Sequence, residues 1–204
     1  MQVLAKSRKE VLQEFRTGGI LQAARAVFAR NGYTAATIDE IAEAAGVAKG
    51  TVYLYFDSKR ELFLATLREG VLELHAEVQR DIDSAASAAA KIRAFIHGRL
   101  HYCDRNRDFF RIYYTEFASL QVHASDESPA FQDLYDQQAA LLESILRRGI
   151  RQGEIRSCNV PRTARLIYDL TRAAIARHVR DGKSNHIKES TSELCDFIWR
   201  GIQC

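Results

Sequence analysis

Apolar residues recur three and four positions apart along almost the whole chain, and no stretch alternates regularly between apolar and polar residues. The first spacing is that of an amphipathic α-helix, whereas alternation is typical of a half-buried β-strand. Only two prolines, Pro129 and Pro161, occur in 204 residues, and proline is the residue that most strongly ends a helix. The sequence therefore predicts an all-α protein of about nine or ten helices.

The composition excludes several classes of protein. Apolar residues make up 47% and charged residues 27% of the chain, which favours a folded domain over a disordered one. The four cysteines are scattered without a C-x-x-C pair, so neither a zinc site nor a disulfide framework is indicated. No apolar run approaches the length of about 18 residues that a membrane span needs. We expect a soluble cytoplasmic protein with no metal, no cofactor and no membrane partner.

Helix boundary signals suggest three segments. Thr37 with Glu40 and Ser58 with Glu61 form capping boxes, which mark helix N-termini. The pair Gly18–Gly19 is expected to separate a short leading helix from the next one. The predicted segments are an N-terminal extension, a helix-turn-helix DNA-binding domain and a helical effector-binding and dimerisation domain: 1–16, 17–63 and 64–204.

Two short helices on either side of Gly46 have the spacing of a helix-turn-helix motif. On the second of them, Val52 and Phe56 lie four residues apart and are expected to pack inward. The opposite face then carries Lys49, Gly50 and Tyr53.

The outward face suits the major groove of DNA. Lysine donates to guanine or phosphate oxygens, and tyrosine offers a hydroxyl and an apolar ring. Gly50 is the informative residue, because a mid-helix glycine costs roughly 1 kcal/mol relative to alanine. Close approach of the helix backbone to DNA would explain that cost.

The segment from Ile20 to Leu67 resembles the DNA-binding domain of the TetR family of transcriptional regulators. Three motifs carry the resemblance, namely F-A-x-x-G-Y, T-x-x-x-I-A-x-x-A-G-V and K-G-T-V-Y-x-Y-F-x-S-K-x-E-L. They cover about a quarter of the chain and are highly specific. The resemblance implies a homodimer that binds double-stranded operator DNA.

The resemblance also assigns roles to individual residues. Thr37 corresponds to a phosphate-binding helix cap, although capping alone would explain it. Tyr55 and Lys59 correspond to phosphate clamps, with a core position and a solvated charge as the respective alternatives. The complete set of DNA-binding candidates is Thr37, Ala48, Lys49, Gly50, Thr51, Tyr53, Tyr55 and Lys59.

Aromatic residues are concentrated between positions 95 and 117. A well-filled helical core explains most of them, but effector pockets also need apolar walls with a few polar groups. The effector-binding candidates are Phe110, Tyr114, Phe117, Tyr135, Gln138, Leu142, Tyr168, Thr171 and Arg172.

Ten basic and three acidic residues between positions 147 and 183 give this segment a net charge of +7. Such a run is usually a solvated helix face or the edge of an interface. The alternative is an anionic effector, such as a fatty acid or its coenzyme A thioester, paired by arginine.

The last two helices are expected to form a four-helix bundle with their counterparts across a two-fold axis. A dimer would present two recognition helices about one DNA turn apart, or a multiple of it. The interface candidates are Ala173, Ala174, Val179, Leu194, Phe197, Ile198 and Ile202.

These observations predict a repressor that a small apolar or anionic amphipathic effector releases from a pseudo-palindromic operator. Activation in place of repression stays open. The main alternative is an architectural or protein-regulated DNA-binding module without an effector.

An enzyme is not indicated, because the sequence contains no glycine-rich phosphate loop, no Ser-His-Asp set and no metal constellation. His97 and His101 lie four apart, but no third ligand has suitable spacing.

Overall fold

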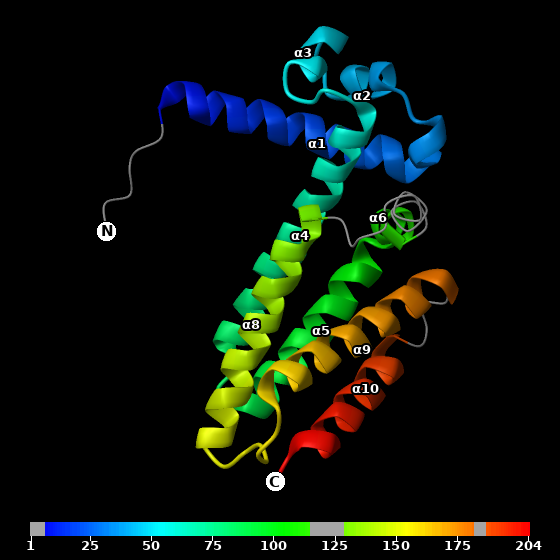
Figure 1. The fold of residues 1–204 in the computed structure, drawn as a ribbon. Coiled ribbons are helices and arrows are strands. Elements are labelled where there is room, and N and C mark those ends of the chain that lie inside the picture. Colours follow the sequence, from blue (N-terminus) through cyan, green and yellow to red (C-terminus); the bar gives the residue numbers. More distant parts are fainter. Residues whose placement is uncertain (1–6, 115–128, 182–186) are drawn as a thin grey trace. The chain divides into compact units, whose positions relative to one another are not determined.

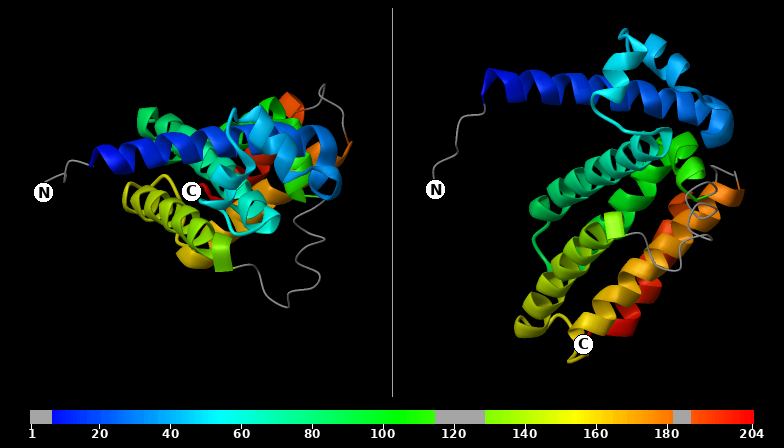
Figure 2. Two further views of the ribbon diagram at one scale, coloured as in Figure 1. Left: turned by 90° about the horizontal axis from the view of Figure 1, so that it is seen from above. Right: turned by 45° about the horizontal axis from the view of Figure 1, so that its top comes forward.

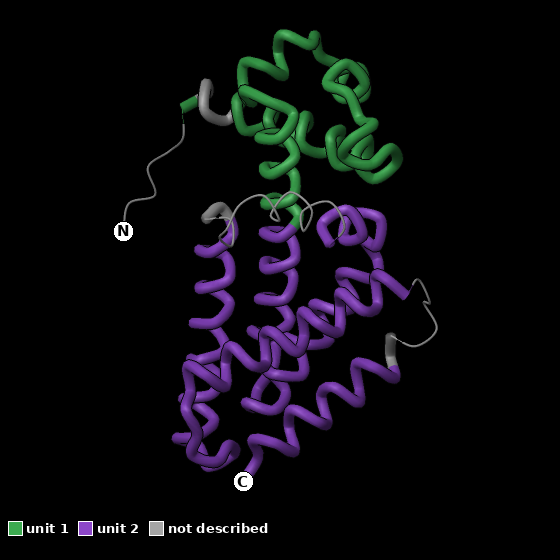
Figure 3. Tube along the Cα trace, turned by 45° about the vertical axis from the view of Figure 1, so that its right-hand side comes forward, with its two compact units in different colours: residues 1–70 green, residues 71–204 purple. Residues whose placement is uncertain are grey.

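The computed structural model describes residues 7–114, 129–181 and 187–204. The chain forms two compact units, Met1–Gly70 and Val71–Cys204, which Figure 3 distinguishes by colour. The boundary lies within one helix, a few residues beyond the domain boundary predicted after residue 63. That predicted boundary stays a prediction.

The described residues form nine helices, and their extended structure is limited to one isolated bridge between Ile155 and Gln203. The prediction of an all-α fold is therefore confirmed. The helices, labelled in Figure 1, are α1 (Arg8–Ala35), α2 (Ile38–Ala44), α3 (Lys49–Tyr53), α4 (Lys59–Ser84), α5 (Ala88–Arg105), α6 (Arg107–Ile112), α8 (Pro129–Arg151), α9 (Val160–Asp181) and α10 (Ile187–Ile202).

Helix α1 continues through Gly18–Gly19, so the break expected there is wrong. Glycine lowers helix propensity by about 1 kcal/mol but does not forbid helical φ and ψ angles, and neither glycine adopts a positive φ. The regular helix is interrupted later, at Gly32, where φ is 76° and ψ is 170°. This is the left-handed side of φ space that favours glycine.

Unit 1 is built around a small apolar core. The rings of Phe28 and Phe63 meet edge to face with their centroids 5.0 Å apart. Helix α2 packs on α1, and α3 packs on α2 through Val52, which is fully buried. Gly46 allows the tight turn between α2 and α3 because its φ is +67°.

Unit 2 contains the second half of α4 and the helices that follow it. Helices α5, α8 and α9 pack against one another, and α10 packs on α5 and α9, as the views in Figure 2 show. The core is mainly aliphatic, with Ile96, Leu100, Leu142 and Leu146 almost fully buried. Among the helices described, none combines the length and the apolar character that crossing a membrane requires.

Candidate DNA-reading surface and effector site

The predicted capping box at the start of α2 is present. The Glu40 backbone N–H donates to the Thr37 hydroxyl at 3.2 Å, and the Thr37 backbone N–H donates to the Glu40 carboxylate at 2.9 Å. The bond from the Thr37 backbone holds the pKa of Glu40 below its usual value. Thr37 is exposed, so its capping role leaves it accessible to a phosphate.

Helix α3 has one buried and one exposed face, as the sequence predicts. Val52 and Phe56 are buried, whereas Lys49 and Gly50 are exposed and Tyr53 is 46% exposed. Of the other candidates on this segment, Ala48 is exposed, and Thr51 and Tyr55 are half-buried.

Leu54 is a residue that sequence reasoning missed. It is 80% exposed directly after α3, where it extends the surface of Tyr53 with an apolar side chain. Its place four residues after Gly50, on the outward side of the helix, is the signal that would have found it.

Lys49 forms an ion pair with Asp39, whose carboxylate lies 2.8 Å from the lysine Nζ. Its hydrogen bond to Asp39 raises the pKa of Lys49. Both side chains are more than half exposed, so solvent screens the pair and it contributes little to stability. Lys49 can therefore exchange Asp39 for a base edge or a phosphate at low cost.

Among the described residues, no neighbour requires glycine at position 50. A Cβ atom built there meets no heavy atom within 4 Å, and Gly50 has no positive φ. The described fold would therefore accept alanine at this position, and a DNA contact by Gly50 stays a prediction.

Gly50→Ala is expected to stabilise the free protein by up to about 1 kcal/mol, since alanine is the better helix former. The added methyl group should nevertheless weaken operator binding by roughly 10-fold to 100-fold, the size of a lost groove contact. Thermal unfolding and fluorescence anisotropy measure the two effects, and Gly18→Ala on α1 serves as control. Unchanged operator affinity would remove Gly50 from the DNA-reading surface.

Lys59 has bonds within unit 1 that the sequence did not indicate. Its Nζ donates to the carbonyl oxygens of Thr34 at 3.0 Å and Ala36 at 2.8 Å. It also lies 4.8 Å from the ring centre of Tyr33. An ammonium group has three N–H donors, so two of them join the end of α1 to the start of α4. A phosphate contact by Lys59 stays a prediction.

In unit 2, several effector-binding candidates lie together. The Tyr135 and Tyr168 rings meet edge to face at 4.8 Å, which connects α8 with α9. Phe110 and Tyr114 belong to one aromatic series, in which Tyr113 lies 6.2 Å from Phe110 and 5.1 Å from Tyr114.

The remaining effector candidates differ in their surroundings. Leu142 and Gln138 are buried. The Thr171 hydroxyl donates to the Ile167 carbonyl of its own helix at 2.7 Å. Arg172 is about half exposed and lies 4.0 Å from Asp169. Phe117 lies outside the described residues.

Arg99 on α5 is a second residue that sequence reasoning missed. It is only 4% exposed, and its guanidinium carbon lies 4.5 Å from the ring centre of Tyr168. Its position three residues after Ile96 and four after Phe95 places it on the apolar face of α5, and this was visible in the sequence.

The arginine-rich segment is spread over the surface of unit 2. Arg147 pairs with Glu143 at 2.9 Å, and Arg177 pairs with Asp181 at 3.5 Å. Arg156 donates to the Gly201 carbonyl at 2.7 and 3.0 Å and thereby holds the end of α10. These contacts are compatible with a solvated face, and the choice between a solvated face, an interface edge and an anion-binding surface stays a prediction.

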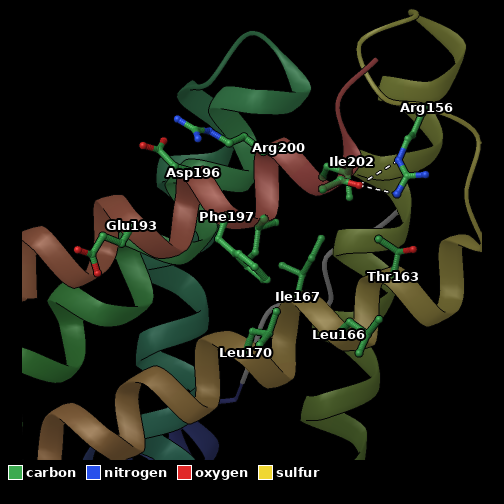
Figure 4. Close-up of a pocket in the computed structure, with 12 residues that line it drawn as sticks. Arg156, Thr163, Leu166, Ile167, Leu170, Glu193, Asp196, Phe197, Arg200 and Ile202 are labelled. Atoms are coloured by element: carbon green, nitrogen blue, oxygen red, sulfur yellow. Dashed lines mark hydrogen bonds between the residues drawn. The ribbon is translucent and has the colours of Figure 1, made fainter.

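Helices α9 and α10 border an apolar groove of about 730 Å³, shown in Figure 4. Phe197 is 69% exposed, and Leu166 and Leu170 are also exposed. Of the interface candidates, Ala173 is likewise exposed, and Ala174 and Leu194 are half-buried. The buried candidates, which pack within the subunit, are Val179, Ile198 and Ile202.

His97 and His101 stack with their ring centroids 4.0 Å apart. In the described part of the chain, no group of three or more metal-ligating side chains is present.

The described residues form a helix-turn-helix unit and a second, helical unit, and comparisons with known proteins identify the family. Residues 20–66 match the model of bacterial regulatory proteins of the tetR family, and residues 85–201 match the tetracyclin repressor-like C-terminal domain. The chain therefore belongs to the TetR family and is an effector-responsive DNA-binding transcriptional regulator.

Two relatives match over nearly their full length. The fatty acid metabolism regulator protein of Bacillus subtilis is 26% identical over 186 residues, which cover 90% of this chain and 93% of the relative. The transcriptional repressor KstR2 of Mycobacterium tuberculosis is 28% identical over 188 residues, 92% of each chain.

A solved structure has the same fold. The transcriptional regulator FadR of Bacillus subtilis, in complex with stearoyl-CoA, aligns with a TM-score of 0.77 at 23% identity. The alignment covers 91% of this chain and 99% of FadR.

Proposed function

We propose that this protein is a homodimeric repressor that an anionic amphipathic effector, a long-chain fatty acid or its coenzyme A thioester, releases from a pseudo-palindromic operator. The observation that carries the DNA-binding part is the division of α3 into a buried face at Val52 and an exposed face at Lys49, Gly50 and Tyr53. Such a helix can enter the major groove without disturbing its own core. The protein would act in the cytoplasm and without a catalytic step.

The effector class is supported by the relatives and by the composition of unit 2. One structural relative was solved with stearoyl-CoA, and one sequence relative is named as a regulator of fatty acid metabolism. The aromatic side chains of Phe110, Tyr114, Tyr135 and Tyr168 suit an acyl chain. Exposed arginines on α8 and α9, such as Arg148 and Arg165, suit the phosphates of coenzyme A.

The homodimer is supported by the groove between α9 and α10. Leu166, Leu170 and Phe197 form an exposed apolar surface on two neighbouring helices. A surface of this kind is typical of an interface, and a two-fold axis would pair it with itself. We propose that the exposed interface candidates, Ala173 and above all Phe197, make the dimer contact.

The test uses the full-length protein and a duplex selected from a random-sequence pool. Fluorescence anisotropy follows operator binding while stearoyl-CoA is added. The controls are coenzyme A alone and uncharged octadecane derivatives. We expect stearoyl-CoA alone to lower operator affinity at least about tenfold, which needs about 1.4 kcal/mol of differential binding. If the protein binds DNA and no acyl-CoA changes the operator affinity, the architectural alternative is favoured.

A further inference from the structure

A positive charge is buried in unit 2 without an ion pair among the described residues. Arg99 is 4% exposed, and its Nε and Nη1 atoms have no hydrogen-bond partner there. Burial of an unpaired charge is strongly unfavourable. An arginine at this position therefore calls for a partner from outside the described residues.

Aromatic rings surround the guanidinium group. Its carbon lies 4.5 Å from the ring centre of Tyr168 on α9 and 5.3 Å from that of Phe95 on α5. Tyr135 on α8 in turn contacts Tyr168. Ring faces attract a cation, but they carry no net charge and accept no strong hydrogen bond from Nε or Nη1.

The titratable groups near Arg99 are neutral. Burial, with the Arg99 charge as a second cause, lowers the pKa of His75 to about 3. Burial raises the pKa of Tyr113 to about 12 and also raises the pKa of the Cys103 thiol. At neutral pH none of these side chains offsets the charge of Arg99.

The carboxylate on the same helix has other partners. Asp104 Oδ1 lies 2.8 Å from His178 Nε2 and 2.8 Å from Arg107 Nη2. These bonds, in opposition to burial, hold the pKa of Asp104 below its usual value. Asp104 is therefore already paired with Arg107 on α6 and with His178 near the end of α9.

Two further buried polar side chains lack a partner among the described residues. Gln138 Oε1 on α8 and both ring nitrogens of His75 on α4 accept or donate no hydrogen bond there. Gln138 is one turn beyond Tyr135, the residue that contacts Tyr168 beside Arg99. His75 is close enough to Arg99 for the arginine charge to add to the effect of burial in lowering its pKa. Buried polar groups without partners are typical of a binding site for a polar ligand group.

We propose that Arg99 binds a carboxylate of the effector within this aromatic region, with Gln138 and His75 as polar neighbours. The inference rests on the proposed function, in which unit 2 binds an anionic amphipath. The carboxylate has two possible sources: the head group of a free fatty acid, or a carboxylate at the far end of an acyl chain whose other end carries coenzyme A.

The experiment compares two matched pairs of probes by isothermal titration calorimetry on the full-length protein. One pair is palmitate and methyl palmitate, and the other is ω-carboxypalmitoyl-CoA and palmitoyl-CoA. In one of the pairs, the wild-type protein should bind the carboxylate member about 10-fold to 100-fold more tightly, the range of a charge-assisted hydrogen bond. The pair that shows the preference identifies the source.

Arg99→Met should abolish this preference while leaving the neutral member bound as before. Arg105→Met on the same helix, which removes an exposed partner of Glu77, should retain the preference. Arg99→Lys keeps the charge and provides a second variant should the methionine variant not fold, and it should retain only part of the preference.

Equal binding within both pairs by the wild-type protein, or a preference that survives in Arg99→Met, would overturn the inference. The proposed function is tested separately by the same data. If palmitoyl-CoA binds and releases the operator without any carboxylate preference, only the role of Arg99 fails. If none of the four probes binds, the proposed acyl effector fails as well.

Discussion

Phe197→Arg is expected to convert the protein from a dimer to a monomer and to abolish operator binding at working concentrations. Phe197 is 69% exposed beside Leu166 and Leu170 in the groove between α9 and α10. Burial of a phenylalanine side chain contributes about 1.5–3 kcal/mol, and two-fold symmetry places the substitution twice in one interface. The dimer dissociation constant should therefore rise by roughly 10²-fold to 10⁴-fold.

Analytical ultracentrifugation measures the dissociation constant, and anisotropy measures operator binding. Leu72→Arg is the matched control, because Leu72 is an exposed leucine on α4, away from the groove. Circular dichroism verifies that both variants fold. A Phe197→Arg protein that remains dimeric would place the interface on another surface.

The stability of unit 2 is expected to fall steeply as the pH decreases from about 6.5 toward 3. Burial, assisted by the charge of Arg99, lowers the pKa of His75 from 6.5 to about 3. Between these values the unfolded chain binds a proton that the folded protein does not, so acid favours unfolding. The full loss of unfolding free energy is on the order of 5 kcal/mol, and no such loss occurs above the unfolded-state pKa.

Urea unfolding at a series of pH values, followed by circular dichroism, measures this dependence. His75→Leu should flatten the profile between about pH 6.5 and pH 4, whereas Leu72→Ala, which changes an exposed side chain without a titratable group on the same helix, should leave it unchanged. If the His75→Leu profile has the same slope as the wild type, His75 is not the group responsible.

Local patterns predicted the structure of α2 and of the segment that follows it well. The capping box of Thr37 and Glu40 needs only four consecutive residues, and the buried positions Val52 and Phe56 lie one helical turn apart. Such features depend on neighbours in sequence, so periodicity and capping rules capture them. The same rules failed at Gly18–Gly19, because low helix propensity was treated as if it were a helix end.

Contacts between distant residues could not be predicted in this way. Lys59 bonds to carbonyl groups 23 and 25 residues earlier in the chain, and no local pattern announces that. Charge density does not single out Arg99, because arginines are most concentrated at positions 147–183. Burial on an apolar helix face, and not density, distinguishes Arg99 from the solvated arginines.

The central claim, that α3 reads base edges in the major groove, is tested most directly by methylation protection of the operator. Dimethyl sulfate modifies guanine N7 in the major groove and adenine N3 in the minor groove. We predict two clusters of protected guanine N7 atoms, separated by one DNA turn or a multiple of it, which Gly50→Ala weakens. Protection confined to adenine N3, or no protection at low ionic strength, would contradict the account.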